Sequence, residues 1–305
     1  MTIRALLIAG PTASGKSAAA VSLAERFGAE IVNADSMQVY QDLQVLTARP
    51  NGDEILRASH RLFGEIDGAV NFSVGRWLAA ATALLEGARR PLIFVGGTGL
   101  YFRALTEGLS DIPQIPGPVR EVLRANAEGV QTEELHGRLK REDPEMAARL
   151  RPSDRQRILR ALEVLAATGT SLREFQGART PAPLRPGEWR GLFLAPDRDL
   201  LNSRIAARFA FMLRDGALEE VAALSRRALD PALPVMRAHG VPHLIAHLEG
   251  RTSLADCEAA SVRDTRHYAK RQFTWARHQM PEFIWTTPDG AVDAGAGLLR
   301  EGVPD

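Results

Sequence analysis

The first hundred residues contain short apolar runs separated by stretches with helical spacing. The apolar runs cover residues 3–9, 30–34 and 91–95, and the helical spacing covers residues 17–27 and 74–85. Short runs without polar alternation are typical of strands that are buried on both faces. Because these strands alternate with helices, the pattern indicates a parallel sheet with helices on both sides.

Two proline clusters interrupt this pattern. They are Pro113, Pro116 and Pro118, and then Pro181, Pro183 and Pro186. The segment between them, residues 119–176, has only helical patterning and is rich in Arg and Glu, whereas an apolar run returns at residues 191–195. We therefore predict an α/β fold with an all-helical domain inserted into a parallel-sheet core. The predicted parts are core residues 1–112 and 188–286, insertion residues 113–187, and a small, polar tail of residues 287–305 that frays.

Composition limits the kind of protein more than its function. The 305 residues are 45% hydrophobic and 25% charged, which is ordinary for a globular protein with a large core. The net charge is only +1, so a polyanionic partner must be held by local clusters of Arg and Lys. Cys257 is the single cysteine, which excludes an internal disulfide. No apolar run approaches the roughly 20 residues that span a bilayer, and we expect a cytoplasmic monomer without a membrane anchor.

A glycine-rich segment follows the first apolar run. It reads Gly10-Pro11-Thr12-Ala13-Ser14-Gly15-Lys16-Ser17 and fits the phosphate-binding pattern GxxxxGK[ST] between a strand and a helix. In such a loop backbone N–H groups surround phosphate oxygens, Lys16 adds charge, and Ser17 can hold a Mg²⁺ ion. A chance glycine turn is the alternative. The pattern predicts a P-loop core that binds a diphosphate or a nucleotide, but it does not say which.

The acidic residue nearest to this loop is not where a nucleoside triphosphatase would have it. Such an enzyme needs an acid at the end of a buried strand, but residues 91–95 are followed by Gly96-Gly97-Thr98. The strand at residues 30–34 does end in an acid, Asp35. Strand ends of a doubly wound sheet point toward the ligand, so we expect Asp35 to face the phosphates. A helix cap or turn former is the alternative for this residue.

Blocks of residues along nearly the whole chain resemble the tRNA dimethylallyltransferases. Besides the phosphate loop, they are residues 35–40 (DSMQVY), 47–50 (TARP), 96–101 (GGTGLY), 154–164 (DRQRILRALEV), 204–216 with Arg204-Ile205 and Arg208-Phe209, and 269–275 (AKRQFTW). The resemblance implies that the N6 amine of the adenosine 3′ of the anticodon attacks dimethylallyl diphosphate with the help of Mg²⁺. It implies that Asp35 is the general base and that Thr12, Lys16 and Arg208 hold the diphosphate. General chemistry agrees, since the amine needs a proton acceptor and the leaving group needs positive charge.

The same resemblance implies which residues meet the anticodon stem-loop of tRNA. They are Asp35, Ser36, Met37, Gln38, Thr98, Arg120, Gln156, Arg157, Ile158, Leu159, Arg160 and Arg237. Without the resemblance, the arginines near residue 157 fit a solvated helix face balanced by Glu163. A basic strip follows near the C-terminus, made of Arg263, Arg266, Lys270, Arg271 and Arg277, and we expect its aromatic residues Tyr268, Phe273 and Trp275 in the core. Residues 237–243 (RAHGVPH) depart from the family pattern, which has Gly-Tyr, a basic residue and Glu there.

Three other functions fit parts of the pattern. The chain could be a small-molecule kinase with ATP in the loop, a prenyltransferase acting on free adenine nucleotides, or an RNA-binding module with a vestigial phosphate loop. The arginine-rich insertion argues against the first two, because a small substrate needs no surface of that size. The intact loop and Asp35 argue against the third.

Overall fold

The computed structural model describes residues 3–177 and 179–300. The chain divides into an α/β unit, Met1–Thr106 with Ala182–Asp305, and a helical unit, Glu107–Pro181. The corresponding predicted boundaries were residues 113 and 187. Within the described ranges, no helix is both long and apolar enough to cross a membrane.

Six strands form one sheet in the α/β unit. They are β1 (Ala5–Ala9), β2 (Glu30–Asn33), β3 (His60–Arg61), β4 (Leu92–Gly96), β5 (Trp189–Leu194) and β6 (Ile284–Thr286). The order is β3-β2-β4-β1-β5-β6, and every neighbouring pair is parallel. In the register, Leu7 of β1 lies between Phe94 of β4 and Gly191 of β5. The predicted parallel sheet is confirmed, and β3 and β6 were missed because two or three residues are too short to show a period.

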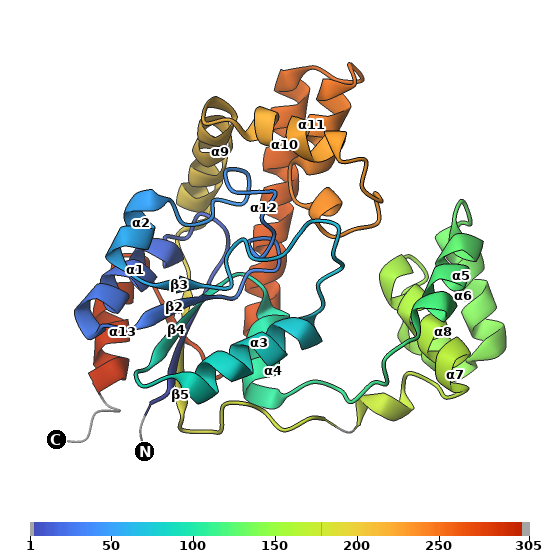
Figure 1. Cartoon of the computed structure of the whole chain (residues 1–305), viewed down its shortest axis with the longest axis horizontal. Helices are drawn as coiled ribbons and strands as arrows, with labels where there is room; N and C mark the ends of the chain where they lie inside the picture. The colour runs from blue at the N-terminus through green and yellow to red at the C-terminus, as the bar shows by residue number, and fades with distance from the viewer. Residues whose placement is uncertain (1–2, 178, 301–305) are drawn as a thin grey trace. The chain divides into compact units, whose positions relative to one another are not determined.

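Helices cover both faces of this sheet (Figure 1). The helices of the α/β unit are α1 (Lys16–Phe27), α2 (Gly52–Arg57), α3 (Val74–Gly87), α4 (Gly99–Glu107), α9 (Arg198–Arg214), α10 (Ala217–Arg226), α11 (Val241–Leu248), α12 (Leu254–Gln279) and α13 (Ala291–Arg300), of which α10 and α11 pack on α9 and α12 and not on the sheet. Along β4, Ile93 and Val95 join the core under α1 and α13, whereas Phe94 meets Trp77 of α3 with ring centroids 6.2 Å apart. On β5, Phe193 meets Phe273 of α12 at 5.5 Å. The alternation of side chains along the strands therefore builds two cores.

Residues 287–300 do not fray, contrary to the prediction. They include α13, which packs on α1 and β5 and buries Leu298 and Leu299. A Cβ atom at Gly295 would lie 2.6 Å from the side chain of Leu23, so glycine permits this close approach. The small residues that suggested a loose tail in the sequence instead allow tight helix packing.

The described residues of the helical unit form four α-helices and one 3₁₀ turn, Glu174–Gln176, in line with the predicted all-helical insertion. The α-helices are α5 (Gly117–Ala127), α6 (Thr132–Glu142), α7 (Pro144–Arg149) and α8 (Arg155–Thr168). Asp143 and Asp154 accept hydrogen bonds from the first turns of α7 and α8, as N-cap residues do. Ile158 and Leu162 of α8 are buried against Leu139 and other apolar side chains, so the unit has its own core.

Candidate active site

The carboxyl ends of β1, β2 and β4 meet at one edge of the sheet. The Ala34 N–H donates to the Val95 carbonyl at 2.8 Å, and the Thr98 N–H donates to the Ala34 carbonyl at 3.2 Å. At Gly96 a Cβ atom would lie only 2.1 Å from the Ala34 carbonyl, so only glycine allows the chains to come this close. The segments after these three strands therefore share one site, as expected for a doubly wound sheet.

The phosphate loop has the backbone conformation that an anion needs. Ala13 and Gly15 have left-handed φ angles of 62° and 87°, and α1 starts at Lys16 without a side-chain cap. Successive N–H groups in such a turn point toward a common centre, and the helix dipole adds to their positive potential. The Ser14 hydroxyl is fully buried under the loop and has no hydrogen-bond partner within the described residues.

Gln272 of α12 ties the phosphate loop to the end of β4. Its Oε1 accepts from the Thr12 N–H at 3.4 Å, and its Nε2 donates to the Gly97 carbonyl at 2.9 Å. A Cβ atom at Gly97 would lie 2.2 Å from this amide nitrogen. The position of α12 is thereby coupled to the position of the loop, although the residues are far apart in the sequence.

Two cations lie close to one carboxylate beside this loop. Burial lowers the pKa of Lys16 to about 8, with Asp35 acting to raise it and Arg208 to lower it further. The pKa of Arg208 is also lowered, mainly by burial and against the attraction of Asp35. The Lys16 ammonium donates to the Pro11 carbonyl at 3.2 Å. A bound anion would relieve the repulsion between these two cations, which Asp35 alone does not balance.

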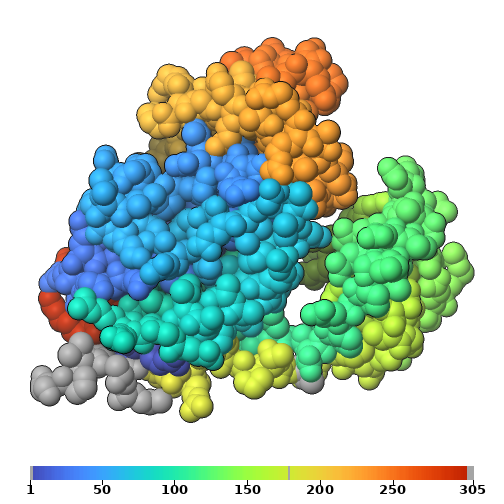
Figure 2. Space-filling view, in the orientation of Figure 1, coloured from blue at the N-terminus to red at the C-terminus, as the bar shows by residue number. Residues whose placement is uncertain are grey.

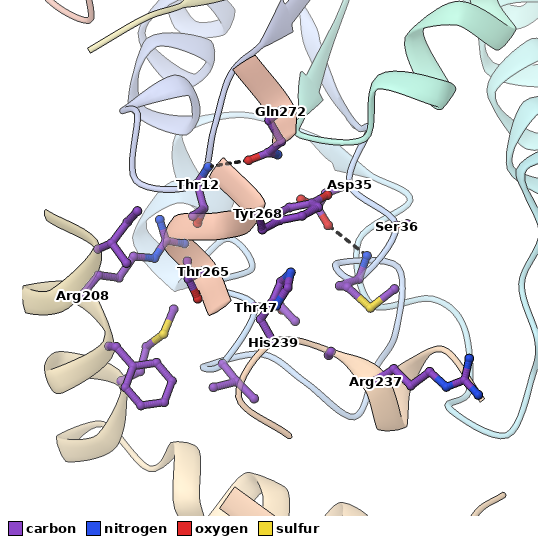
Figure 3. Close-up of a pocket in the computed structure, with 16 residues that line it drawn as sticks. Thr12, Asp35, Ser36, Thr47, Arg208, Arg237, His239, Thr265, Tyr268 and Gln272 are labelled. Atoms are coloured by element: carbon purple, nitrogen blue, oxygen red, sulfur yellow. Dashed lines mark hydrogen bonds between the residues drawn. The ribbon is translucent and has the colours of Figure 1, made fainter. Parts of the chain in front are cut away.

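Hydrogen bonds hold both the carboxylate of Asp35 and the backbone next to it. Its Oδ1 accepts from the Met37 N–H at 2.9 Å, and the neighbouring Ser36 N–H donates to the Thr98 hydroxyl at 2.9 Å. Figure 3 shows the Asp35 carboxylate next to Tyr268 of α12. The carboxylate therefore lines the pocket together with Thr12 of the phosphate loop, and it also accepts the turn-forming hydrogen bond from Met37.

A pocket of about 230 Å³ opens between these residues (Figure 3). Thr12, Asp35 and Arg208 are among the polar residues that line it. Its apolar wall consists of Leu46, Ile205, Phe209 and Met212. One pocket thus combines an anion-binding end with an apolar wall and a carboxylate, all from the α/β unit.

The wall residues Leu46 and Thr47 belong to a loop that α10 holds in place. The Glu220 carboxylate accepts from the N–H groups of Gln44, Val45 and Leu46, the last two at 3.0 and 2.9 Å. From inside the loop, the Gln38 amide donates to the Thr47 and Ala48 carbonyls at 2.8 and 2.9 Å. Figure 2 shows the blue loop surface directly against the orange residues that follow α9.

The structure brings six of the predicted site residues to the pocket. These are Thr12, Asp35, Ser36, Met37, Arg208 and Arg237. Lys16 does not line the pocket, but it lies close enough to Asp35 and Arg208 for both charges to shift its pKa. Ser17 is exposed at the start of α1, and Thr98 and Gln38 support neighbouring loops through the hydrogen bonds given above.

Sequence reasoning missed the side of the pocket that α12 provides. Thr265, Tyr268 and Gln272 are spaced three and four residues apart, so they share one helix face, and all three line the pocket. The expectation that Tyr268 is a core residue was wrong, because its ring faces the pocket and contacts His239 at a centroid distance of 4.7 Å. His239 comes from the segment that departs from the family pattern. The helical spacing of polar residues within an aromatic-rich stretch was the available signal.

The predicted RNA-contacting residues of the helical unit fall into two groups. Gln156 and Arg157 are exposed, and the Arg157 side chain is 69% exposed with Asp154 at 3.4 Å. Ile158, in contrast, is fully buried in the unit's core on the apolar face of α8, and Leu159 packs against that core. The Ile158 side chain therefore belongs to the core and not to the exposed face of α8, and the contact of this stretch with tRNA stays a prediction.

A buried carboxylate organises the arginines beside α8. Glu163 is 3% exposed and pairs with Arg124 at 2.9 Å, with Arg160 at 3.8 Å and with Arg120 at 3.9 Å. Three cations around one anion leave a surplus of positive charge on these partly exposed side chains. Glu163 thus holds the three arginines in place, and their surplus positive charge can still attract phosphates.

A Mg²⁺ ion at this loop would need few protein ligands. Among the described residues, no group of three or more His, Cys, Asp or Glu side chains could form a metal cage. Mg²⁺ commonly takes one or two protein oxygens and completes its shell with substrate phosphates and water. The Ser17 hydroxyl, exposed at the loop, fits that role beside a bound diphosphate.

Comparisons with known proteins identify relatives of this chain. The sequence pattern of the IPP transferase family matches residues 38–279, and that of the isopentenyl transferase family matches residues 3–71. A tRNA dimethylallyltransferase of Methylocella silvestris is 63% identical, covering 93% of this chain and 95% of the relative, and one of Beijerinckia indica is 59% identical, covering 94% and 96%.

Two solved structures have the same fold over nearly the whole chain. The tRNA isopentenylpyrophosphate transferase of Bacillus halodurans is 30% identical with a TM-score of 0.69, covering 98% of this chain and 97% of that one. A eukaryotic dimethylallyltransferase acting on tRNA is 25% identical with a TM-score of 0.78, covering 94% and 74%. The chain therefore belongs to the IPP transferase family, and it is a prenyltransferase, as the sequence blocks predicted.

Proposed function

We propose that this protein transfers the dimethylallyl group of dimethylallyl diphosphate to N6 of the adenosine 3′ of the anticodon in tRNA. The observation that carries the proposal is the single pocket that joins the phosphate loop, the apolar wall and Asp35. We place the reaction in the cytoplasm and assign it to a monomer. Family membership and the tRNA dimethylallyltransferases among the relatives support this function over kinase chemistry.

The proposed reaction assigns one role to each end of the pocket. The loop N–H groups, Lys16 and Arg208 hold the diphosphate, and the apolar wall holds the five-carbon tail. As the bond between the adenine nitrogen and the allylic carbon forms, the bond from that carbon to the diphosphate oxygen breaks. Asp35 accepts the proton from the amine, and diphosphate leaves with its negative charge balanced by Lys16 and Arg208. The adenine has to leave its stack to reach Asp35.

We assign Mg²⁺ to Ser17 and the diphosphate. When bound there, the ion would withdraw charge from the leaving oxygens and so assist their departure. The protein's own part is to present the Ser17 hydroxyl at the first turn of α1 and to keep the loop N–H groups converged.

The direct test is prenylation of tRNA in a defined mixture. The purified protein, unmodified tRNA, dimethylallyl diphosphate and Mg²⁺ are combined without ATP, and the tRNA nucleosides are analysed by mass. A dimethylallyl adenosine should appear only with all components present. A parallel mixture contains AMP in place of tRNA, and prenylation of AMP without prenylation of tRNA would favour the small-molecule prenyltransferase.

The pKa of Lys16 makes diphosphate affinity depend on pH. The free protein carries Lys16 with a pKa of about 8, and a bound diphosphate should raise that value because it favours the charged form. Affinity is therefore expected to be constant below about pH 8 and to fall by up to about tenfold per pH unit above it. Calorimetric titration of a non-reactive diphosphate analogue between pH 7 and 9.5 measures this.

The matched control for this titration is Lys16→Arg, because a guanidinium stays charged over the whole range. In this variant the decline above pH 8 should disappear, whatever its absolute affinity. A decline of equal slope in both proteins would assign the pH dependence to another group.

We propose that the arginines near the start of α8 bind tRNA phosphates. Replacing Arg157 and Arg160 with alanine should weaken tRNA binding and lower the slope of log affinity against log salt by about 1 per lost phosphate contact. Diphosphate affinity should not change, since that pocket lies in the α/β unit. Filter binding at several salt concentrations measures the tRNA affinity and its salt slope.

Arg138→Ala is the comparison variant for this experiment. Arg138 is a partly exposed arginine of α6 in the same unit, paired with Glu142. The Arg138→Ala variant should leave the salt slope of tRNA binding unchanged if tRNA binds specifically to the α8 face. Equal losses in both variants would mean that the unit binds tRNA only through its general charge.

A further inference from the structure

Asn33 is a fully buried polar residue at the end of β2, two residues before Asp35. Its Oδ1 accepts a hydrogen bond from the Asp35 N–H at 2.7 Å. Its Nδ2 donates to the Asp35 carbonyl and to the Leu62 carbonyl, both at 3.0 Å. One side chain thus holds both polar backbone groups of Asp35 and fastens them to the segment after β3.

These hydrogen bonds fix the backbone that carries the Asp35 carboxylate. When a short side chain hydrogen-bonds to the backbone two residues later in the chain, it forms a turn. This turn needs no hydrogen bonds to a neighbouring strand. The carbonyl of Asn33 itself accepts from the indole N–H of Trp77 at 2.8 Å, so the residue is held from the α3 side as well. With Met37 and Thr98 as the other anchors, the turn around Asp35 is fastened on several sides.

A neutral amide suits this place better than other small polar side chains. It provides an acceptor and two donors, which match one N–H and two carbonyls. A carboxylate could not donate to the carbonyls and would place a like charge beside Asp35. A hydroxyl forms the same kind of turn, but more weakly.

We propose that Asn33 is a positioning residue for prenyl transfer, one that holds Asp35 where it can accept the proton of the adenine amine. This inference rests on the proposed role of Asp35 as the base. Because catalytic groups must be held close to their reacting geometry, loosening this turn lowers the rate of the chemical step. The phosphate loop follows β1 and not β2, so a change at Asn33 should leave it intact.

The test compares Asn33→Ala with Asn33→Ser, two variants that differ by one hydroxyl group. Asn33→Ala is expected to lower kcat by on the order of 10²-fold with little change in KM for dimethylallyl diphosphate. Asn33→Ser should lower kcat less, since its hydroxyl can still accept from the Asp35 N–H. Equal kcat values for the two variants would contradict the turn-holding role.

A double-variant measurement separates positioning from a loss of folded protein. In an Asp35→Asn background there is no base left to position, so adding Asn33→Ala should change kcat only slightly. Leu298→Ala, which opens a hole under α13, serves as a stability control and should lower the melting temperature without lowering kcat. Equal losses of kcat from Asn33→Ala in both backgrounds would show that its role is structural and overturn the proposal.

The outcomes also separate this inference from the proposed function. If Asp35→Asn alone keeps normal turnover, the base assignment fails and with it the premise of the inference. If Asp35→Asn is slow while Asn33→Ala turns over normally, the base assignment stands and the positioning role is overturned.

Discussion

Replacing Asp35 with asparagine is expected to slow prenyl transfer on the order of 10²- to 10⁴-fold. The carboxylate lines the pocket beside the phosphate loop, and asparagine has the same shape but cannot accept the amine proton. The Oδ1 of asparagine can still accept from the Met37 N–H, so the turn should survive. Single-turnover kinetics with bound substrates measure the effect, and the affinities for tRNA and diphosphate should remain close to normal.

Asp42→Asn is the matched control for Asp35→Asn. Asp42 is a carboxylate of the same loop region that pairs with Arg227 and accepts from the Gly68 N–H, and it does not line the pocket. Its loss can cost stability but should leave the single-turnover rate near normal at a temperature where the protein is folded. Near-normal turnover of Asp35→Asn would refute the assignment of Asp35 as the base.

The parts of the molecule that the sequence predicted correctly are those that depend on neighbouring residues. The phosphate loop is one contiguous segment, and its conformation follows from Gly15 and the helix that starts at Lys16. The buried strands β1, β2 and β4 were visible as apolar runs, and the parallel arrangement followed from the helices between them. Asp35 could be placed at the ligand edge because a parallel sheet brings all strand ends of one kind together.

The far wall of the pocket could not be predicted, because distant segments meet there. Gln272 bonds to Thr12 across 260 positions of sequence, and no local pattern records such a contact. Phe209 and Met212 occupy apolar positions of an amphipathic helix, and both are buried. They nevertheless line the pocket, because an apolar helix face looks the same in sequence whether it covers a core or a ligand's tail.

The charges of the helical unit show a similar limit. The sequence allowed Arg160 to be either a phosphate contact or part of a solvated face balanced by Glu163. The structure shows that Glu163 is buried and holds Arg120 and Arg124 as well as Arg160. Sequence spacing revealed the pairing of Arg160 with Glu163 but not the arginines from α5, since those approach from another helix.

Replacing Lys16 with alanine is expected to remove transfer activity by at least on the order of 10²- to 10³-fold. Its ammonium is buried close to Arg208 and Asp35, where a charge acts with little screening by water. Without it, the diphosphate loses a partner both when bound and when negative charge grows on the leaving oxygens. We therefore expect a lower kcat as well as weaker diphosphate binding. Lys140→Ala removes an equal charge from α6 of the helical unit and should leave both quantities unchanged.

The Lys16 variant also decides which phosphate compound reacts in the loop. ATP can enter weakly, because the loop N–H groups contact phosphate oxygens and not a base, so ATP affinity alone is not informative. The decisive measurement is tRNA prenylation with dimethylallyl diphosphate and Mg²⁺ in the absence of ATP, in parallel with ATP hydrolysis by the same samples. Transfer without ATP that is lost in Lys16→Ala identifies dimethylallyl diphosphate as the substrate of the loop. If transfer instead required ATP, or ATP were hydrolysed at enzymatic rates without prenylation, the loop would be a nucleotide site and the assignment of Lys16 to the leaving diphosphate would fail.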